Sequence, residues 1–127
     1  MDYLDANVLF YALTDNGAKG AACKRLLLEL PLLTNSLTLD EVAFPLLKKS
    51  RPDAVRILRE LVACPTLSFA PFAEDCFDSF INLVEAGLDP RDAIHAATAL
   101  KNGCKVIWSE DKDFDKVKGL TRKVPWK

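Results

Sequence analysis

Four acidic residues that lie far apart in the sequence stand at positions where they could share one site. Each comes at the end of an apolar run or in the first turn of a helical pattern: Asp5, Glu41, Asp92 and Asp111. Two carboxylates held about 4 Å apart repel by roughly 4 kcal/mol at an effective dielectric near 20, so four of them need a compensating charge. A hard cation that prefers oxygen ligands, such as Mg2+ or Mn2+, would supply it.

Short apolar runs alternate with longer helical patterns along the chain, and this alternation predicts the elements that carry the acids. Buried strands are expected at 3–5, 32–35, 67–69 and 105–109, with a final edge strand around Val124. The expected helices are one at about 6–13, a second opened by Gly17 and stopped by Pro31, a third capped by Ser36 or Thr38 and containing Pro45, a fourth from Pro52, a fifth at about 73–86 closed by Gly87, and a sixth at 91–102.

Strands separated by helices imply right-handed crossovers and a parallel sheet. The predicted fold class is therefore α/β, a three-layer α/β/α sandwich with a central, mainly parallel sheet. In such sheets the working site lies at the carboxyl ends of the strands. Asp5 and Asp111 fall at or just past two of these ends.

Length and composition fit a single domain, residues 1–127, with half of the residues hydrophobic and 28% charged. The net charge is −1, so contact with a nucleic acid would depend on local basic patches. Residues 48–59 carry five Lys or Arg against one Asp, and residues 112–127 carry six against two. Each patch reads equally well as a solvated face.

The cysteines are widely spaced, without a C-x-x-C pair, and the chain has a single histidine. This disfavours a zinc or redox site and suits reduced thiols, most of them buried. The amino terminus lacks the features of a signal peptide, and no apolar run is long enough to span a membrane. We expect a cytoplasmic protein without a membrane partner.

Three of the four acids also have a structural interpretation. Glu41 follows Thr38 by three residues and could close a capping box. Asp92 would lie where the helix dipole favours any anion, and Asp111 lies in an acidic turn where a solvated charge is usual. Asp5 ends an apolar strand, where a carboxylate has no obvious structural purpose.

Four segments, in this order and at these separations, resemble the PIN domain family, particularly its VapC-type branch in bacteria and archaea. They are Asp5-Ala6-Asn7, Thr38-x-x-Glu41, Asp92-Ala93-Ile94-His95-Ala96-Ala97 and Ser109-Glu110-Asp111-Lys112-Asp113-Phe114. The resemblance spans residues 3–120. The departures are alanine at position 6 and serine at position 109, where the family often has threonine, and neither removes a carboxylate.

The resemblance implies a metal-dependent endoribonuclease that cleaves RNA phosphodiesters and leaves a 5′-phosphate and a 3′-hydroxyl. Mg2+ or Mn2+ would be held by the four acids: Asp5, Glu41, Asp92 and Asp111. Asn7 and Ser109 would orient carboxylates or metal-bound waters. Asp113 is either an additional ligand through water or a residue that stabilises the turn.

The expected chemistry is in-line attack by a metal-activated water, with one ion or with two ions about 4 Å apart. It needs neither a serine nucleophile nor a histidine. We interpret His95, three residues after Asp92, as a packing or hydrogen-bonding residue, because Mg2+ prefers oxygen. A phosphatase of the haloacid dehalogenase kind is disfavoured, because position 7 is Asn where that class needs an acidic proton donor.

VapC-type proteins are generally homodimers neutralised by a small antitoxin. By resemblance we expect an RNA substrate, a homodimer that uses apolar positions of the third and fourth expected helices, and a VapB-type antitoxin. Two alternatives stay open: a housekeeping PIN nuclease in RNA processing, and a catalytically silent RNA-binding or assembly module.

The crowding of the acids predicts that Asp5→Asn leaves the metal-free fold as stable as the wild type or more stable, because one repelling charge is removed. Urea unfolding of both proteins in the presence of a chelator measures this difference in the free energy of unfolding. Marked destabilisation of the variant would identify Asp5 as a structural carboxylate instead.

Overall fold

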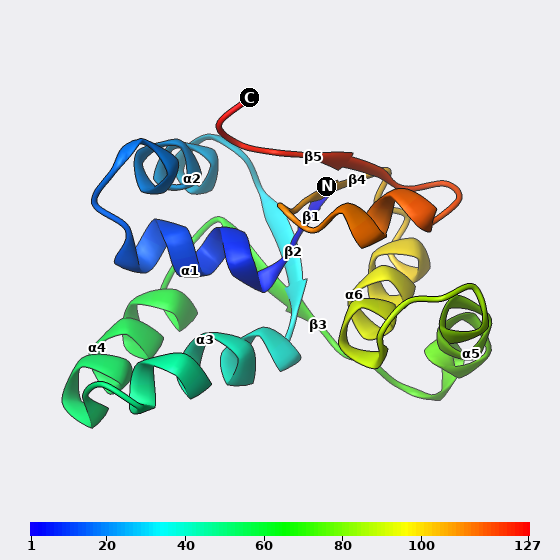
Figure 1. Cartoon of the computed structure of the whole chain (residues 1–127), viewed down its shortest axis with the longest axis horizontal. Coiled ribbons are helices and arrows are strands. Elements are labelled where there is room, and N and C mark those ends of the chain that lie inside the picture. Colours follow the sequence, from blue (N-terminus) through cyan, green and yellow to red (C-terminus); the bar gives the residue numbers. More distant parts are fainter.

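The computed structural model describes all 127 residues and places one five-stranded sheet between two groups of helices (Figure 1). The strands are β1 (Asp2–Leu4), β2 (Leu32–Asn35), β3 (Leu67–Ala70), β4 (Val106–Trp108) and β5 (Thr121–Lys123). Their order is β3-β2-β1-β4-β5, and all neighbours pair in parallel. The prediction of an α/β/α sandwich with a parallel sheet is confirmed.

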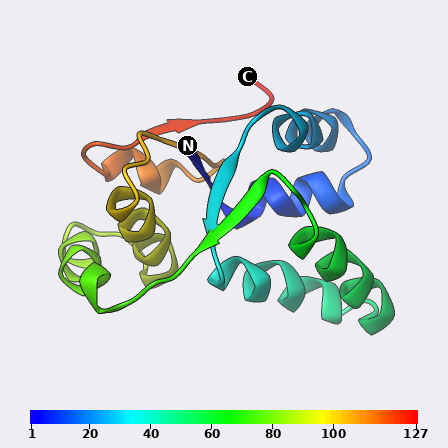
Figure 2. The ribbon, with the colours of Figure 1, turned by 180° about the vertical axis from the view of Figure 1, so that it is seen from behind.

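Six helices cover the two faces of the sheet. They are α1 (Ala6–Thr14), α2 (Ala18–Glu29), α3 (Leu37–Leu47), α4 (Arg51–Val62), α5 (Phe77–Glu85) and α6 (Pro90–Lys101), with short 3-10 turns at η1 (Glu74–Cys76) and η2 (Lys112–Lys116). Helices α1 to α4 lie on one side of the sheet, and α5 and α6 lie on the other, as the view from behind in Figure 2 also shows.

Alternation along the strands divides the core into two parts. Tyr3 and Leu33 point into the core under α5 and α6, whereas Leu4 and Leu32 point into the core under α1 to α4. The first of these cores is rich in alanine because α6 contributes four buried alanines to it: Ala93, Ala96, Ala97 and Ala99. Such small side chains let the helix backbone lie close to the strands, which brings the first turn of α6 to the sheet edge.

The start of α3 differs from the prediction. Ser36 occupies the N-cap position but makes no side-chain cap; the Asn35 carboxamide oxygen instead accepts from the Leu37 N–H at 2.7 Å. Thr38 lies inside the helix, and its hydroxyl bonds to Thr34 at 2.8 Å. The capping-box interpretation of Glu41 is therefore wrong, and its side chain is free to turn elsewhere.

Glycines in the left-handed region set the ends of α5 and α6. Gly87 has a φ of 107°, and the Leu88 N–H reaches back to the Leu83 carbonyl at 3.1 Å. The predicted glycine cap at Gly87 is thus confirmed. Gly103, with a φ of 73°, ends α6 in the same way. The turn at Gly87 leads directly into Pro90, the first residue of α6.

The last strand lies earlier than predicted. It comprises Thr121–Lys123, beside β4, rather than residues around Val124. Its short polar sequence carries no apolar alternation, so hydrophobic periodicity could not locate it and placed the strand too late in the sequence. All four cysteines are free, with Cys64 partly buried and the other three buried, as expected. None of the helices combines the length and the apolarity needed to cross a membrane.

The contact between α2 and the turn before it predicts a costly substitution at Gly20. An added Cβ would lie 1.9 Å from the Asp15 carbonyl oxygen, so Gly20→Ala should destabilise the fold by about 1–3 kcal/mol despite the better helix propensity of alanine. The exposed Lys24→Ala on the same helix is the control and should change stability by less than about 0.5 kcal/mol. Chemical denaturation measures both, and a gain in stability for Gly20→Ala would contradict the packing described.

Candidate metal centre

The four acids predicted from the sequence all lie at the carboxyl edge of the sheet. Asp5 directly follows β1, Glu41 lies in the helix after β2, Asp92 lies in the first turn of α6, and Asp111 follows β4 by three residues. Because β1 lies between β2 and β4, the segments that follow these strands are neighbours in space. Asn35, at the end of β2, also donates to the Thr98 hydroxyl at 3.0 Å and fastens α6 to this edge.

Asp5 is a buried carboxylate with several partners. It is only 5% exposed, its Oδ1 accepts from the Ala6 N–H at 2.8 Å as the N-cap of α1, and its Oδ2 accepts from the Ser109 hydroxyl at 2.6 Å. Burial raises the pKa of Asp5, while His95 and Ser109 act against this rise. The view that Asp5 has no structural purpose was therefore wrong, because it also starts α1.

Ser109 ties together the chain segments of the site. Besides donating to Asp5, its hydroxyl accepts from the Asp111 N–H at 3.0 Å and lies 3.4 Å from the Asn7 amide nitrogen. The Asn7 carboxamide oxygen in turn accepts from the Glu110 N–H at 3.4 Å. Asn7 and Ser109 thereby hold the segment after β4 against the first turn of α1.

Three carboxylates converge beside this network. One oxygen from each of Asp92, Asp111 and Asp113 lies within 4.8 Å of the others. Burial raises the pKa of Asp92 to about 7, with further contributions from the negative charges of Asp111 and Asp5. Asp5 is therefore electrostatically joined to this cluster, although its oxygens already have partners.

Asp113 and Asp111 divide the roles that the sequence left open. The Asp111 carboxylate accepts from the Asp113 N–H at 2.9 Å, so the turn is stabilised by Asp111. Asp113 belongs to the cluster of three acids and also lies 3.4 Å from the Lys116 ammonium. Asp113 thus lies beside Asp92 and Asp111, whereas the sequence indicated either an additional ligand through water or a residue that stabilises the turn.

Glu41 approaches the site through His95. The fully buried imidazole of His95 bonds through Nε2 to Glu41, lies 3.9 Å from Asp5 Oδ1, and meets the Tyr3 hydroxyl through Nδ1 at 2.7 Å. Burial alone would lower the pKa of His95, but the hydrogen bond to Glu41 and the charges of Asp5, Glu41 and Asp92 outweigh it and raise the pKa. These contacts agree with the interpretation of His95 as a hydrogen-bonding residue.

Sequence reasoning missed Tyr3, because its partner His95 lies 92 residues away. It also missed a groove of about 400 Å³ that runs from Asn7 and Glu41 along α1 and α3. Phe10, Phe44 and Arg91 line this groove. The position of Arg91 directly before Asp92 was a signal that could have drawn attention to it.

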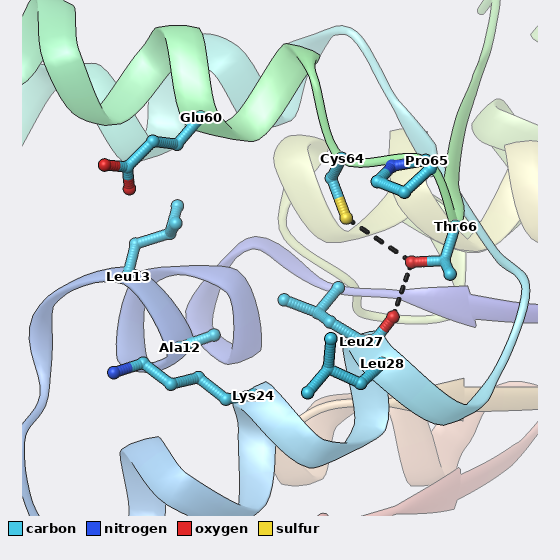
Figure 3. Close-up of a pocket in the computed structure, with 9 residues that line it drawn as sticks. All are labelled: Ala12, Leu13, Lys24, Leu27, Leu28, Glu60, Cys64, Pro65 and Thr66. Atoms are coloured by element: carbon cyan, nitrogen blue, oxygen red, sulfur yellow. Dashed lines mark hydrogen bonds between the residues drawn. The ribbon is translucent and has the colours of Figure 1, made fainter.

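A larger hollow, of about 490 Å³, lies among α1, α2 and α4 (Figure 3). Apolar side chains such as Leu13 and Leu27 line it, and Glu60 is its one carboxylate. Thr66 directly precedes β3, so this hollow borders the amino end of that strand, away from the acids. The chemistry-bearing residues gather at the opposite edge.

The donors at the carboxyl edge fit a hard divalent cation. The cluster offers carboxylate oxygens only, and no cysteine takes part in it. Oxygen donors suit Mg2+ and Mn2+ better than softer ions such as Zn2+. A bound cation would also offset the desolvation cost of Asp92 and its repulsion by the neighbouring carboxylates.

Several solved structures share the fold. VapBC2 from Rickettsia felis, bound to a DNA fragment from its promoter, is 18% identical with a TM-score of 0.75 over 98% of both chains. A toxin-antitoxin complex from Klebsiella pneumoniae is 20% identical with a TM-score of 0.73 over 98% of both chains. VapC20 of Mycobacterium tuberculosis, a Sarcin-Ricin loop cleaving toxin, is 18% identical with a TM-score of 0.74 over 91% of this chain and 93% of its own.

The comparison with curated proteins finds no match. The sequence model of the PIN domain, in contrast, matches residues 3–120. This range contains β2, β3, β4, all six helices and every acid of the candidate metal centre, while β1 begins one residue before it and β5 lies just beyond it. The chain therefore belongs to the PIN domain family.

Proposed function

We propose that this chain is a nuclease that hydrolyses RNA phosphodiester bonds with Mg2+ or Mn2+ and serves as the toxin of a toxin-antitoxin pair. The observation that carries the proposal is the convergence of Asp92, Asp111 and Asp113 beside the buried Asp5 at the carboxyl edge of a PIN domain. The fold likeness to VapC20, a Sarcin-Ricin loop cleaving toxin, supports RNA as the substrate.

The residues of this chain divide the work by position. Asp92, Asp111 and Asp113 would hold the cation, with Asp5 beside them and Glu41 at the adjoining groove. When bound, the cation would lower the pKa of a water molecule and offset negative charge on the phosphate. Hydrogen bonds fix Asp5, Glu41 and Asp111 before substrate arrives, so these three acids need little reorganisation during the reaction.

The neutral residues Asn7 and Ser109 contribute by holding the acidic side chains in a fixed orientation. The Ser109 hydroxyl restrains Asp5, while Asn7 and the Asp111 N–H hold Ser109 in place. A substitution at Ser109 would disturb three contacts together. We propose that Asn7 and Ser109 orient the acids rather than bind the cation themselves.

Positive and aromatic side chains next to the acids suit a polyanionic substrate. Arg91 and Phe44 line the groove beside Glu41, and the Lys48 ammonium lies 4.7 Å from the centre of the Phe44 ring. Phe44 is 60% exposed, so its ring is accessible to a nucleobase. Arg91 and Lys48 could pair with phosphates on either side of the scissile bond.

Two partners belong to the proposal. Exposed apolar side chains on α3 and α4 support a homodimer through this face: Leu47, Val55 and Val62. The fold likeness to the Klebsiella pneumoniae toxin-antitoxin complex supports a VapB-type antitoxin as the second partner. An antitoxin that presents a basic side chain would find the acids at the end of the groove.

Cleavage of a structured RNA tests the proposed chemistry. The wild type should cleave it with Mn2+ and not with a chelator, while Asp92→Asn and Asp5→Asn should each lose activity by about a hundredfold or more. Asp78→Asn, an exposed acid on α5, is the matched control and should cleave like the wild type. Gel analysis of end-labelled RNA measures the rates; equal activity of wild type and Asp92→Asn would indicate a contaminating nuclease.

The raised pKa of Asp92 predicts how the metal-free protein responds to pH. Its folded-state pKa of about 7 exceeds the ordinary value near 3.9, so the folded chain binds a proton that the unfolded chain releases. The metal-free protein should therefore become more stable as the pH falls from about 8 to 5. The raised pKa values of Asp5 and His95 act in the same direction.

Thermal unfolding in a chelator, followed across this pH range, checks the effect. Asp92→Asn should flatten the pH dependence, because the substituted amide does not titrate. Saturating Mn2+ should reverse the slope, because the cation competes with the proton for the same carboxylates. If the melting temperature of the metal-free wild type instead falls as the pH is lowered from 8 to 6, the raised pKa of Asp92 is contradicted.

A further inference from the structure

The His95 imidazole occupies the space between two acids that the sequence assigned to metal binding. Its Nε2 bonds to Glu41 and lies 3.9 Å from Asp5 Oδ1, and the ring is fully buried. An ionised carboxylate only accepts hydrogen bonds, so the proton between His95 and Glu41 lies on Nε2. One N–H group thus faces both carboxylates.

The ring cannot turn away easily, because it is held from the other side. The Tyr3 hydroxyl meets Nδ1 at 2.7 Å from the central strand of the sheet, and the two rings pack edge to face with centroids 5.7 Å apart. Tyr3 is itself fully buried. A chain of contacts therefore runs from the core to Glu41 through His95.

This arrangement bears on how many cations the edge can hold. Two-metal hydrolases place their ions about 3.5–4 Å apart, with carboxylates shared between them. A second ion beside the cluster of Asp92, Asp111 and Asp113 would need Asp5 and Glu41 as ligands. The imidazole already stands between those two carboxylates.

We propose that His95, anchored by Tyr3, is a positioning residue that takes the place of a second cation, so that this site binds a single divalent ion on the side of Asp92, Asp111 and Asp113. The inference rests on the proposed metal-dependent function and adds the number of ions to it. His95 sets the position of Glu41 and partly compensates Asp5, without touching the cation.

The stoichiometry of Mn2+ binding tests this inference. Isothermal titration of the metal-stripped full chain should give about one ion per chain for the wild type. His95→Gln keeps an amide N–H within reach of Glu41 and should also bind about one ion. His95→Ala removes the N–H and opens the space, so about two ions should bind.

Thr98→Ala is the matched control for general disturbance of α6. Thr98 is also fully buried, one turn after His95, and its hydroxyl bonds to Asn35 rather than to an acid. This variant should keep one ion with an affinity within about threefold of the wild type. A purely structural role of His95 would make His95→Ala and Thr98→Ala behave alike.

Two ions in the wild type would overturn the inference, as would one ion in His95→Ala at wild-type affinity. If His95→Ala does not fold, anomalous scattering from wild-type crystals soaked in Mn2+ decides the matter: one peak beside Asp92 supports the proposal, and a second peak between Asp5 and Glu41 refutes it. Two ions together with RNA cleavage would leave the proposed function intact, whereas no bound ion and no cleavage would overturn both.

Discussion

Repulsion between like charges is the constraint around which the carboxyl edge of this sheet is built. Carboxylates from four separate segments meet there, and the pKa of Asp92 is raised to about 7 by burial and by its acidic neighbours. Such a group of charges opposes folding unless partners compensate it. The placement of strands, helices and neutral side chains around the edge can be understood as that compensation.

The compensating groups are hydrogen-bond donors drawn from several parts of the fold. Asp5 receives a backbone N–H and the Ser109 hydroxyl, while His95 turns its N–H to Glu41 and faces Asp5. The alanine-rich face of α6 lets that helix lie against the sheet, which places both His95 and Asp92 at the edge. Core packing and site electrostatics are therefore coupled through one helix.

The sequence predicted the architecture well because its signals were local. Apolar runs, prolines and Gly87 marked strands and helix ends, and the carboxyl-end rule placed Asp5 and Asp111 at one edge. The position of the polar strand β5 was not predicted correctly, since this strand has no apolar alternation. Local patterns can locate an element without showing which partners its side chains will find.

Side-chain pairing was the part that local patterns could not supply. Thr38 and Glu41 satisfy a capping-box pattern, yet tertiary contacts to Thr34 and His95 prevail. Asp113 joined Asp92 and Asp111 because the η2 turn brings it inward, whereas the alternative of a turn-stabilising role fell to Asp111. The contact between Tyr3 and His95 depends on strand order, which no neighbouring residue encodes.

The central position of β1 also bears on how the protein is made. This strand precedes the other four in the sequence, yet its two neighbours in the sheet are β2 and β4, and β4 begins only at Val106. Contacts between residues so far apart in the sequence form late, because closing the long intervening loop costs conformational entropy. During synthesis, Asp5 can meet Ser109 and Asp111 only after the segment that follows β4 has been made, so a shorter nascent fragment lacks the assembled acidic centre.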